Sequence, residues 1–274
     1  MTEMAALIFD PAYRPLLLFG TASNVYSFVL VVLALRHGDW LTDQRFSLTK
    51  FYVLMGWVPL AFVSLALLIS PRYLALFVAA GLLGIVGELI VSVVWRRFFA
   101  EPIWTYSYRS VLAGYTSTLN FLPWAVGALL FCETRRVLGG APPAGLALDR
   151  PLWVCAAALA AGVLVAWPLS RLTSARERRF TKRAFAVFCI PIAFTGAGLA
   201  ALVSPHYLLL MAAFALVGFL TEYTYGRGMS LFFERGLWTY NHWKIDHGHT
   251  SFVTFPLWAL GGLYFHFIAG FVGL

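Results

Sequence analysis

Two stretches of this chain carry the same pattern of residues, 134 positions apart. The 64 residues from Ser70 to Glu133 align without a gap with the 64 that begin at Ser204, and 23 of the aligned pairs are identical. A repeat of this length constrains the fold, because both copies are expected to form the same structure. Positions at which the copies differ are therefore the first places to look for function.

The composition places the chain in a membrane. Hydrophobic residues make up 61% of it and charged residues only 12%. The apolar residues fall into runs of about 20, the length at which a helix crosses a bilayer. We predict an all-α membrane protein with about eight transmembrane helices, at about residues 15–35, 51–70, 73–95, 117–134, 151–170, 185–204, 207–229 and 251–273.

The repeat divides these spans into two groups of four. Residues 1–138 form the first four-helix repeat, residues 139–150 a Gly- and Pro-rich linker, and residues 151–274 the second repeat. Because four is an even number, both repeats enter the membrane from the same side and lie parallel. Within each repeat, Ser70-Pro71 or Ser204-Pro205 separates two spans. Proline cannot continue a helix from the preceding turn, so these pairs predict tight re-entry turns.

The basic residues predict the orientation. Fifteen of the 20 Lys and Arg residues lie in loops that follow odd-numbered spans, so the positive-inside rule makes those loops cytosolic and puts both termini outside. The charges form short clusters beside the spans rather than one basic face, which argues against a nucleic-acid partner. We expect a multi-pass protein of the cell membrane, the inner membrane if the cell is Gram-negative, in contact with membrane lipid.

Two glutamates lie inside predicted spans. Glu88 and Glu222 occupy equivalent positions in the two copies, roughly two turns from the predicted cytosolic ends of the third and seventh spans. An ionisable residue within a span is costly unless it is paired, neutral or in a wet cavity, so both are candidate functional residues. The alternative is structural: each caps a neighbouring helix or pairs with a nearby arginine, Arg97 or Arg227.

The second repeat adds titratable groups that the first lacks. Lys244, Asp246, His247 and His249 stand where the first repeat has Ser110, Leu112, Ala113 and Tyr115. Imidazoles near carboxylates can act as general acids and bases around physiological pH. We therefore predict that the catalytic residues are Glu222, Asp246, His247, His249 and Glu88.

The added groups have two other interpretations. They could ligate a metal ion, but His242, His247 and His249 match neither the H-E-x-x-H helix nor the histidine-box spacings of membrane di-iron enzymes. We therefore expect no metal and no other cofactor. They could also form a solvated loop whose histidines lie at the level of the lipid headgroups.

Aromatic residues surround the polar segment of the second repeat in the sequence. Tryptophan and tyrosine are enriched at membrane interfaces, so an aromatic belt explains part of this enrichment. A binding pocket is the functional interpretation, because ring faces stabilise cations and stack on unsaturated chains. The residues that we expect to contact the substrate are Tyr223, Trp238, Tyr240, His242, Trp243, Lys244, Trp104 and Tyr106.

About 45 residues of the second repeat resemble a known family. The segment Gly218-Phe219-Leu220-Thr221-Glu222-Tyr223, with Gly226, Trp238-Thr239-Tyr240, Gly248 and Trp258 after it, resembles the putative ABC-transporter permease family of small bacterial membrane proteins. A fainter likeness joins the segment 236–241 to the membrane-embedded lycopene cyclases. The first resemblance implies a transport component, and the second implies an isoprenoid-modifying enzyme, a cyclase.

Two functions are therefore expected. The first is an integral membrane enzyme that acts by acid/base chemistry on a lipid or isoprenoid, a small hydrophobic substrate, at the cytosolic side of the bilayer. The alternative is a permease, with or without a partner subunit, in which Glu88 and Glu222 bind a coupling proton or a cationic solute. The added polar groups of the second repeat favour the enzyme, whereas the shared glutamates favour the permease.

Overall fold

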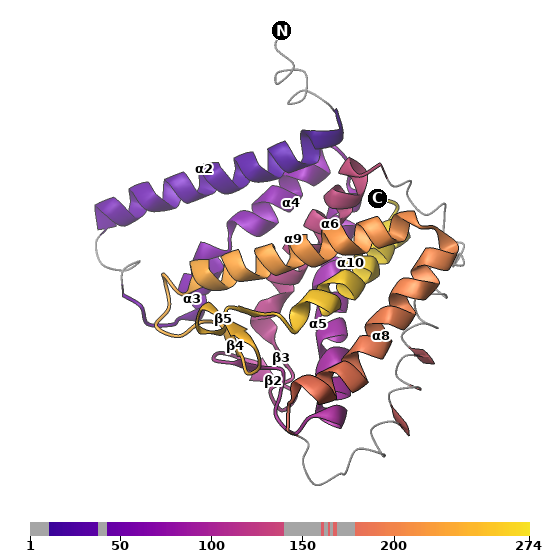
Figure 1. Ribbon diagram of the computed structural model, residues 1–274. Coiled ribbons are helices and arrows are strands. Elements are labelled where there is room, and N and C mark those ends of the chain that lie inside the picture. The colour runs from indigo at the N-terminus through magenta and orange to yellow at the C-terminus, as the bar shows by residue number, and fades with distance from the viewer. Residues whose placement is uncertain (1–10, 38–42, 140–159, 162–163, 165–166, 169–178) are drawn as a thin grey trace.

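The computed structural model describes residues 11–37, 43–139, 160, 161, 164, 167, 168 and 179–274. Most of these residues are helical. The helices are α2 (Arg14–His37), α3 (Leu48–Leu54), α4 (Trp57–Leu68), α5 (Arg72–Phe98), α6 (Phe121–Val137), α8 (Lys182–Val203), α9 (His206–Met229) and α10 (Thr254–Phe271), with 3-10 turns at Pro11–Tyr13, Thr118–Asn120 and Asp246–Gly248. Helices α5, α6, α9 and α10 pack together, α2 lies against α4, and α8 lies against α9 (Figure 1).

Six helical segments in the described part of the chain are long and apolar enough to cross a membrane. They are Pro11–Arg36, Leu48–Leu68, Arg72–Phe98, Lys182–Val203, His206–Met229 and Thr254–Phe271. Helix α6 stands at the predicted fourth span and has 17 residues. The predicted fifth span, at about 151–170, falls mostly outside the described residues. The structure is thus that of a multi-pass helical membrane protein, and the count of eight spans stays a prediction.

The two proline turns form as expected. Pro71 directly precedes α5 with φ −60°, and Pro205 directly precedes α9 with φ −55°. Proline is tolerated at a helix start because its missing N–H would have no partner there. Each proline therefore ends one helix and begins the next without a connecting loop.

Three pairs of short strands lie where the sequence predicted loops. β2 (Ser110–Val111) pairs with β3 (Thr116–Ser117), and β5 (Lys244–Ile245) pairs with β6 (Thr250–Ser251). The two hairpins share their left-handed residues: φ is +53° at Leu112 and +43° at Asp246, 134 positions later, and it is +58° at Ala113 and +59° at His247. Four-residue turns of this kind need positive φ, which non-glycine residues adopt at a cost.

The third strand pair joins the two halves of the chain. β1 (Trp104–Tyr106) and β4 (Trp238–Tyr240) are antiparallel, and Thr105 lies opposite Thr239, its counterpart in the sequence repeat. Two further backbone hydrogen bonds flank the pair, Ser107 N to Leu237 O and Asn241 N to Ile103 O, each of 3.0 Å. Ser107 and Asn241 are equivalent positions of the repeat, and so are Ile103 and Leu237, so the two bonds are equivalent as well. A local twofold axis therefore passes between Thr105 and Thr239.

Aromatic rings meet around the same axis. Trp124 of α6 and Trp258 of α10 have ring centroids 5.6 Å apart. Glycines admit both rings: a Cβ on Gly84 would lie 2.4 Å from Trp124, and a Cβ on Gly218 would lie 2.6 Å from Trp258. Real Cβ atoms do not approach so closely, so α5 and α9 each need glycine where a tryptophan crosses them.

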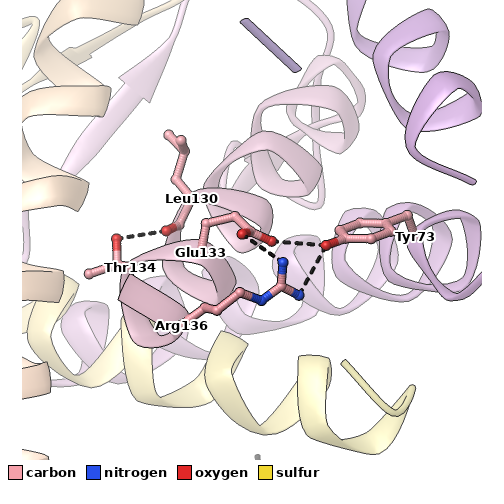
Figure 2. Close-up of polar contacts among 5 residues, drawn as sticks. All are labelled: Tyr73, Leu130, Glu133, Thr134 and Arg136. Carbon is pink, nitrogen blue, oxygen red and sulfur yellow. Dashed lines mark hydrogen bonds and ion pairs between the residues drawn. The ribbon is translucent and has the colours of Figure 1, made fainter. Parts of the chain in front are cut away.

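The far ends of α5 and α6 are joined by a polar cluster (Figure 2). Tyr73 OH donates to Glu133 Oε1 at 3.0 Å, and Arg136 donates to Glu133 Oε2 at 3.0 Å and to Tyr73 OH at 3.1 Å. Glu133 is fully buried. A buried carboxyl needs such partners, because an unpaired charge costs several kcal/mol of desolvation there. The hairpins lie at the other end of α5 (Figure 1). This cluster therefore holds α5 and α6 together at the end of the bundle that is farthest from the hairpins.

Candidate functional site

A cavity of about 750 Å³ lies between the two halves of the chain. Residues of α5, α6, α8, α9 and α10 line it, together with residues of β1 and β4. Its wall is apolar and aromatic, and the aromatic residues that are identical in the two copies and line it from both copies are Trp104, Tyr106, Trp124, Phe131, Trp238, Tyr240, Trp258 and Phe265. Glu88 and Glu222 both line it, which brings the two glutamates of the sequence repeat to one space.

Glu222 accepts hydrogen bonds from several side chains. Tyr240 OH donates to Oε1. Thr250 Oγ1 donates to Oε2 at 2.6 Å and Trp258 Nε1 at 3.2 Å, and Thr254 Oγ1 lies 3.4 Å from the same oxygen. The residue itself is 9% exposed. An ionised carboxylate only accepts hydrogen bonds, so these three donors are matched to it, whereas Thr254 Oγ1 gives its one hydrogen to Ser251 O at 2.7 Å.

Glu88 has a smaller shell. Thr116 Oγ1 donates to its Oε2, and Asn120 Nδ2 lies 2.9 Å from both carboxylate oxygens. Asn120 also donates to Tyr106 OH at 3.0 Å. The threonine contact is the same in both halves, but Asn120 separates Tyr106 from Glu88, whereas Tyr240 reaches Glu222 directly. The two carboxyl groups therefore have related but unequal surroundings.

Neither arginine considered as a partner pairs with a glutamate of the cavity. Arg227 Nε lies 3.8 Å from Asp246 Oδ2, and the Arg97 guanidinium lies 4.2 Å from the centre of the Trp167 ring. The described residues contain no ion pair to Glu88 or Glu222 within 4.0 Å. The salt-bridge alternative for these glutamates is wrong, and their hydrogen bonds come from neutral side chains.

Asp246 and His247 lie at the hairpin surface, away from the cavity lining. Tyr223 OH donates to Asp246 Oδ2 at 3.1 Å, and His247 Nε2 is 4.0 Å from Asp246 Oδ1 with its side chain 86% exposed. Tyr223 follows Glu222 in α9, and successive helical residues point about 100° apart. The structure thus brings Asp246 to Tyr223, Arg227 and His247, and it separates this group from the carboxyl of Glu222.

The remaining histidines of the segment are buried in the hairpin region. His242 stacks on Phe180 at 4.2 Å between centroids, and His249 lies beside Gly226. Burial lowers the pKa of both imidazoles below the usual value of 6.5, because the protonated form is harder to desolvate. Trp243 packs edge-on against Phe180 and Phe185, and Lys244 is exposed. None of these four residues lines the cavity.

Three kinds of site residue escaped the sequence prediction. Thr116 and Thr250 donate to the glutamates, Trp258 does so as well, and Asn120 and Thr254 complete the shells. The threonines and the tryptophan were visible as identities between the copies. The prediction was based on positions at which the copies differ, so it did not include these residues. A polar residue that both copies keep is also a signal, because it can be the hydrogen-bond partner of the glutamate that both copies keep.

No family model, curated protein or solved structure matches this chain. The fold and the site define its class: a multi-pass helical membrane protein with two buried carboxyl groups in one apolar cavity. Its resemblance to permeases and lycopene cyclases stays a prediction. Within the part of the chain that the structure describes, no three His, Cys, Asp or Glu side chains are grouped to hold a metal ion.

Proposed function

We propose that the protein is an integral membrane enzyme that performs acid/base chemistry on an apolar lipid or isoprenoid bound between its two halves. One observation carries the proposal: Glu88 and Glu222 line the same cavity, whose wall is otherwise apolar and aromatic. Ligand pockets are typically apolar with a few polar groups that fix orientation and supply chemistry. A large apolar space with two carboxyl groups suits a hydrophobic molecule that gains and loses a proton.

The two carboxyl groups take different roles in this proposal. Glu88, which has fewer donors, adds its proton to one carbon of a substrate double bond, and the neighbouring carbon becomes a carbocation. The aromatic walls stabilise that charge through their ring faces. Glu222, which acts as a carboxylate and accepts from Tyr240, Thr250 and Trp258, removes a proton from an adjacent carbon and restores a double bond. The net result is an isomerisation or a cyclisation, and the site resets when Glu222 gives its proton to water and Glu88 takes a new proton from water.

The arrangement of the chain belongs to the same proposal. We take the protein to consist of two parallel four-helix repeats, with the hairpins and the cavity mouth on the cytosolic side. The equal spacing of α5 and α9, of both hairpins and of their left-handed residues supports the repeat. Each repeat then supplies one carboxyl group, and neither forms the cavity alone.

The acid/base chemistry can be tested in deuterated water. A proton that is added to carbon comes from solvent, so a C20 to C40 isoprenoid incubated with the purified protein in D₂O should gain deuterium, measured by mass spectrometry. Glu88→Gln and Glu222→Gln should both stop the incorporation. The matched control is Tyr26→Phe, which removes a hydroxyl bonded to Val53 O; neither of these residues lines the cavity. Wild-type protein that incorporates no deuterium into any isoprenoid offered contradicts the proposal.

The permease remains the second candidate because of the local twofold axis. Equivalent glutamates at equivalent places suit a site shared by two rocking repeats. Under that function, reconstituted vesicles would move protons or a cationic solute, and Glu88→Gln and Glu222→Gln would reduce the flux equally. Asp246, His247 and His249 stay predicted catalytic residues that this proposal does not require.

A further inference from the structure

The cavity extends further on one side of the local twofold axis than on the other. Trp95 and Phe98, at the end of α5, and Phe185, at the start of α8, line it. The residues at the same positions on the other side, 134 places away, are Met229, Phe232 and Phe51. None of these three lines the cavity. The cavity therefore has one arm, the α5–α8 arm, which ends at Trp95, Phe98 and Phe185.

The two sides can be compared residue by residue, because α3 and α8 begin at equivalent positions. Ser47 caps α3 by accepting from Lys50 N, and Thr181, 134 positions later, caps α8 by accepting from Ala184 N, each at 3.1 Å. The structural repeat thus includes both helix starts. A difference between the two sides at these positions is a difference in side chains and not in backbone.

The end of α5 and the start of α8 meet at the tip of this arm. Phe98 stacks on Phe188 with ring centroids 4.9 Å apart, and Trp95 stacks on Phe180 at 5.8 Å. Figure 1 shows these two helix ends side by side. Any charged group on the same faces, one turn further out, therefore lies at the opening of the arm.

Each helix carries such a basic residue. Residues three, four or seven apart share one face of a helix. Arg97 follows Ile90 and Val94, which line the cavity, and Lys182 precedes Phe185 and Cys189, which also line it. Arg97 and Lys182 therefore continue the two lining faces beyond the last apolar residues. Both are exposed.

Neither basic residue is used by the protein itself as an ion-pair partner. Within the part of the chain that the structure describes, no acidic side chain lies within 4.0 Å of Arg97 or Lys182. The equivalent positions on the other side are Leu231 and Leu48. The positive-inside rule favours basic residues on both sides alike, so it does not explain why this pair stands only where the cavity extends.

We infer that the cavity binds a single-chain apolar molecule with a terminal phosphate, whose chain lies in the cavity and whose phosphate is bound by Arg97 and Lys182. Arginine and lysine are the side chains that bind phosphate, and their two positive charges match the charge of about −2 on a phosphate monoester. The inference rests on the proposed function and deepens it, because it names the substrate class for the same cavity. Glu88 precedes Arg97 by nine residues of α5, or about 14 Å along the helix axis, so the phosphate is held apart from the carboxyl group.

The size of the cavity favours one chain over two. A volume of about 750 Å³ holds about 25 non-hydrogen atoms at roughly 30 Å³ each, the share of one water molecule in the liquid. A C20 isoprenoid chain fits this space. The two acyl chains of a phospholipid have more atoms than it can hold, so an isoprenyl phosphate is the ligand that we expect rather than a membrane phospholipid.

Geranylgeranyl phosphate and geranylgeraniol test the inference, because they share a C20 chain and differ in the phosphate. Binding of each tritiated probe to the purified protein in detergent is measured by scintillation proximity. We expect the phosphate to bind about 20-fold more tightly than the alcohol. Arg97→Leu and Lys182→Leu, which introduce the residue of the other side, should each weaken phosphate binding about fivefold, the effect of one exposed charge pair, and leave alcohol binding unchanged.

Three controls accompany these variants. Arg235→Leu removes an exposed basic residue that does not line the cavity, and it should alter neither probe. Lys182→Arg keeps the charge and should keep the preference for phosphate. Dioleoyl phosphatidic acid, a two-chain phosphate, should not displace geranylgeranyl phosphate; displacement at equal concentration would show that the site takes a phospholipid headgroup and would overturn the assignment.

The outcomes separate this inference from the proposed chemistry. A preference for the phosphate that depends on Arg97 and Lys182 supports the inference even if no isoprenoid gains deuterium. Equal affinity for the two probes, binding of neither, or a preference that survives both leucine substitutions overturns it, even if an isoprenoid gains deuterium. The two substitutions lie on different helices, so one variant that fails to fold leaves the other as a test.

Discussion

Replacing Glu222 in two ways separates its chemical role from its structural one. In Glu222→Gln the amide oxygen can take the place of Oε2, which accepts from Thr250 and Trp258. The amide NH₂ then faces Tyr240 OH, which can turn from donor to acceptor. Every group keeps a partner, so the expected loss of unfolding free energy is about 1 kcal/mol or less.

Glu222→Ala removes the acceptor altogether. Thr254 keeps its bond to Ser251 O at 2.7 Å, but Tyr240 OH and Trp258 Nε1 lose the one partner that each has. A buried donor left unpaired costs about 1–3 kcal/mol, so two of them cost about 2–6 kcal/mol. At about 2–4 °C per kcal/mol for a chain of this size, the midpoint of thermal unfolding should fall by about 4–24 °C.

The assay is thermal unfolding in detergent, run beside deuterium incorporation. Both variants should lose incorporation, whereas only Glu222→Ala should lose much stability. An alanine variant as stable as the glutamine variant would show that Tyr240 OH and Trp258 Nε1 do not depend on Glu222. A glutamine variant that still incorporates deuterium would refute the assignment of Glu222 as the base.

Three further outcomes are expected. Gly218→Ala should lower stability and activity, because its Cβ would lie 2.6 Å from Trp258, whereas Gly198→Ala, with nothing within 4 Å, should do neither in the same unfolding assay. Reporter fusions after Arg109 should report the cytosol and fusions at the C-terminus the outside; the reverse result would refute the predicted orientation. Burial lowers the pKa of His249, so the unfolded state binds the proton first, and stability should fall as pH drops below about 6.5. His249→Gln should reduce that dependence.

The sequence predicted the parts of this structure that depend on local chemistry. Runs of apolar residues placed the helices, and proline placed the turns at Pro71 and Pro205, since each signal acts within a few residues. The pairing of β1 with β4 was not predicted, because strands of three residues join partners 134 positions apart and nothing local specifies such a contact.

The candidate site was predicted in part for the same reason. Both glutamates were found, since an acid in an apolar span stands out in any sequence. Asp246 was grouped with Glu222 because both are acidic and lie 24 residues apart. Their side chains diverge because Tyr223, one position along α9, is the residue that meets Asp246. Which side chains meet depends both on the face of α9 that each residue occupies and on where the hairpin lies against α9. The sequence indicates the face of the helix, but it does not indicate the position of the hairpin.

The pairing of Thr105 with Thr239 has a consequence for how such a cavity can arise. A strand pair with twofold symmetry could also form between two identical short chains, as in a symmetric homodimer. Such a dimer has one disadvantage: every substitution occurs on both walls at once. It could not place tyrosine at position 225 of one wall while valine stays at position 91 of the other. Joining both copies in one polypeptide removes that restriction, so one wall can change while the other keeps the original packing.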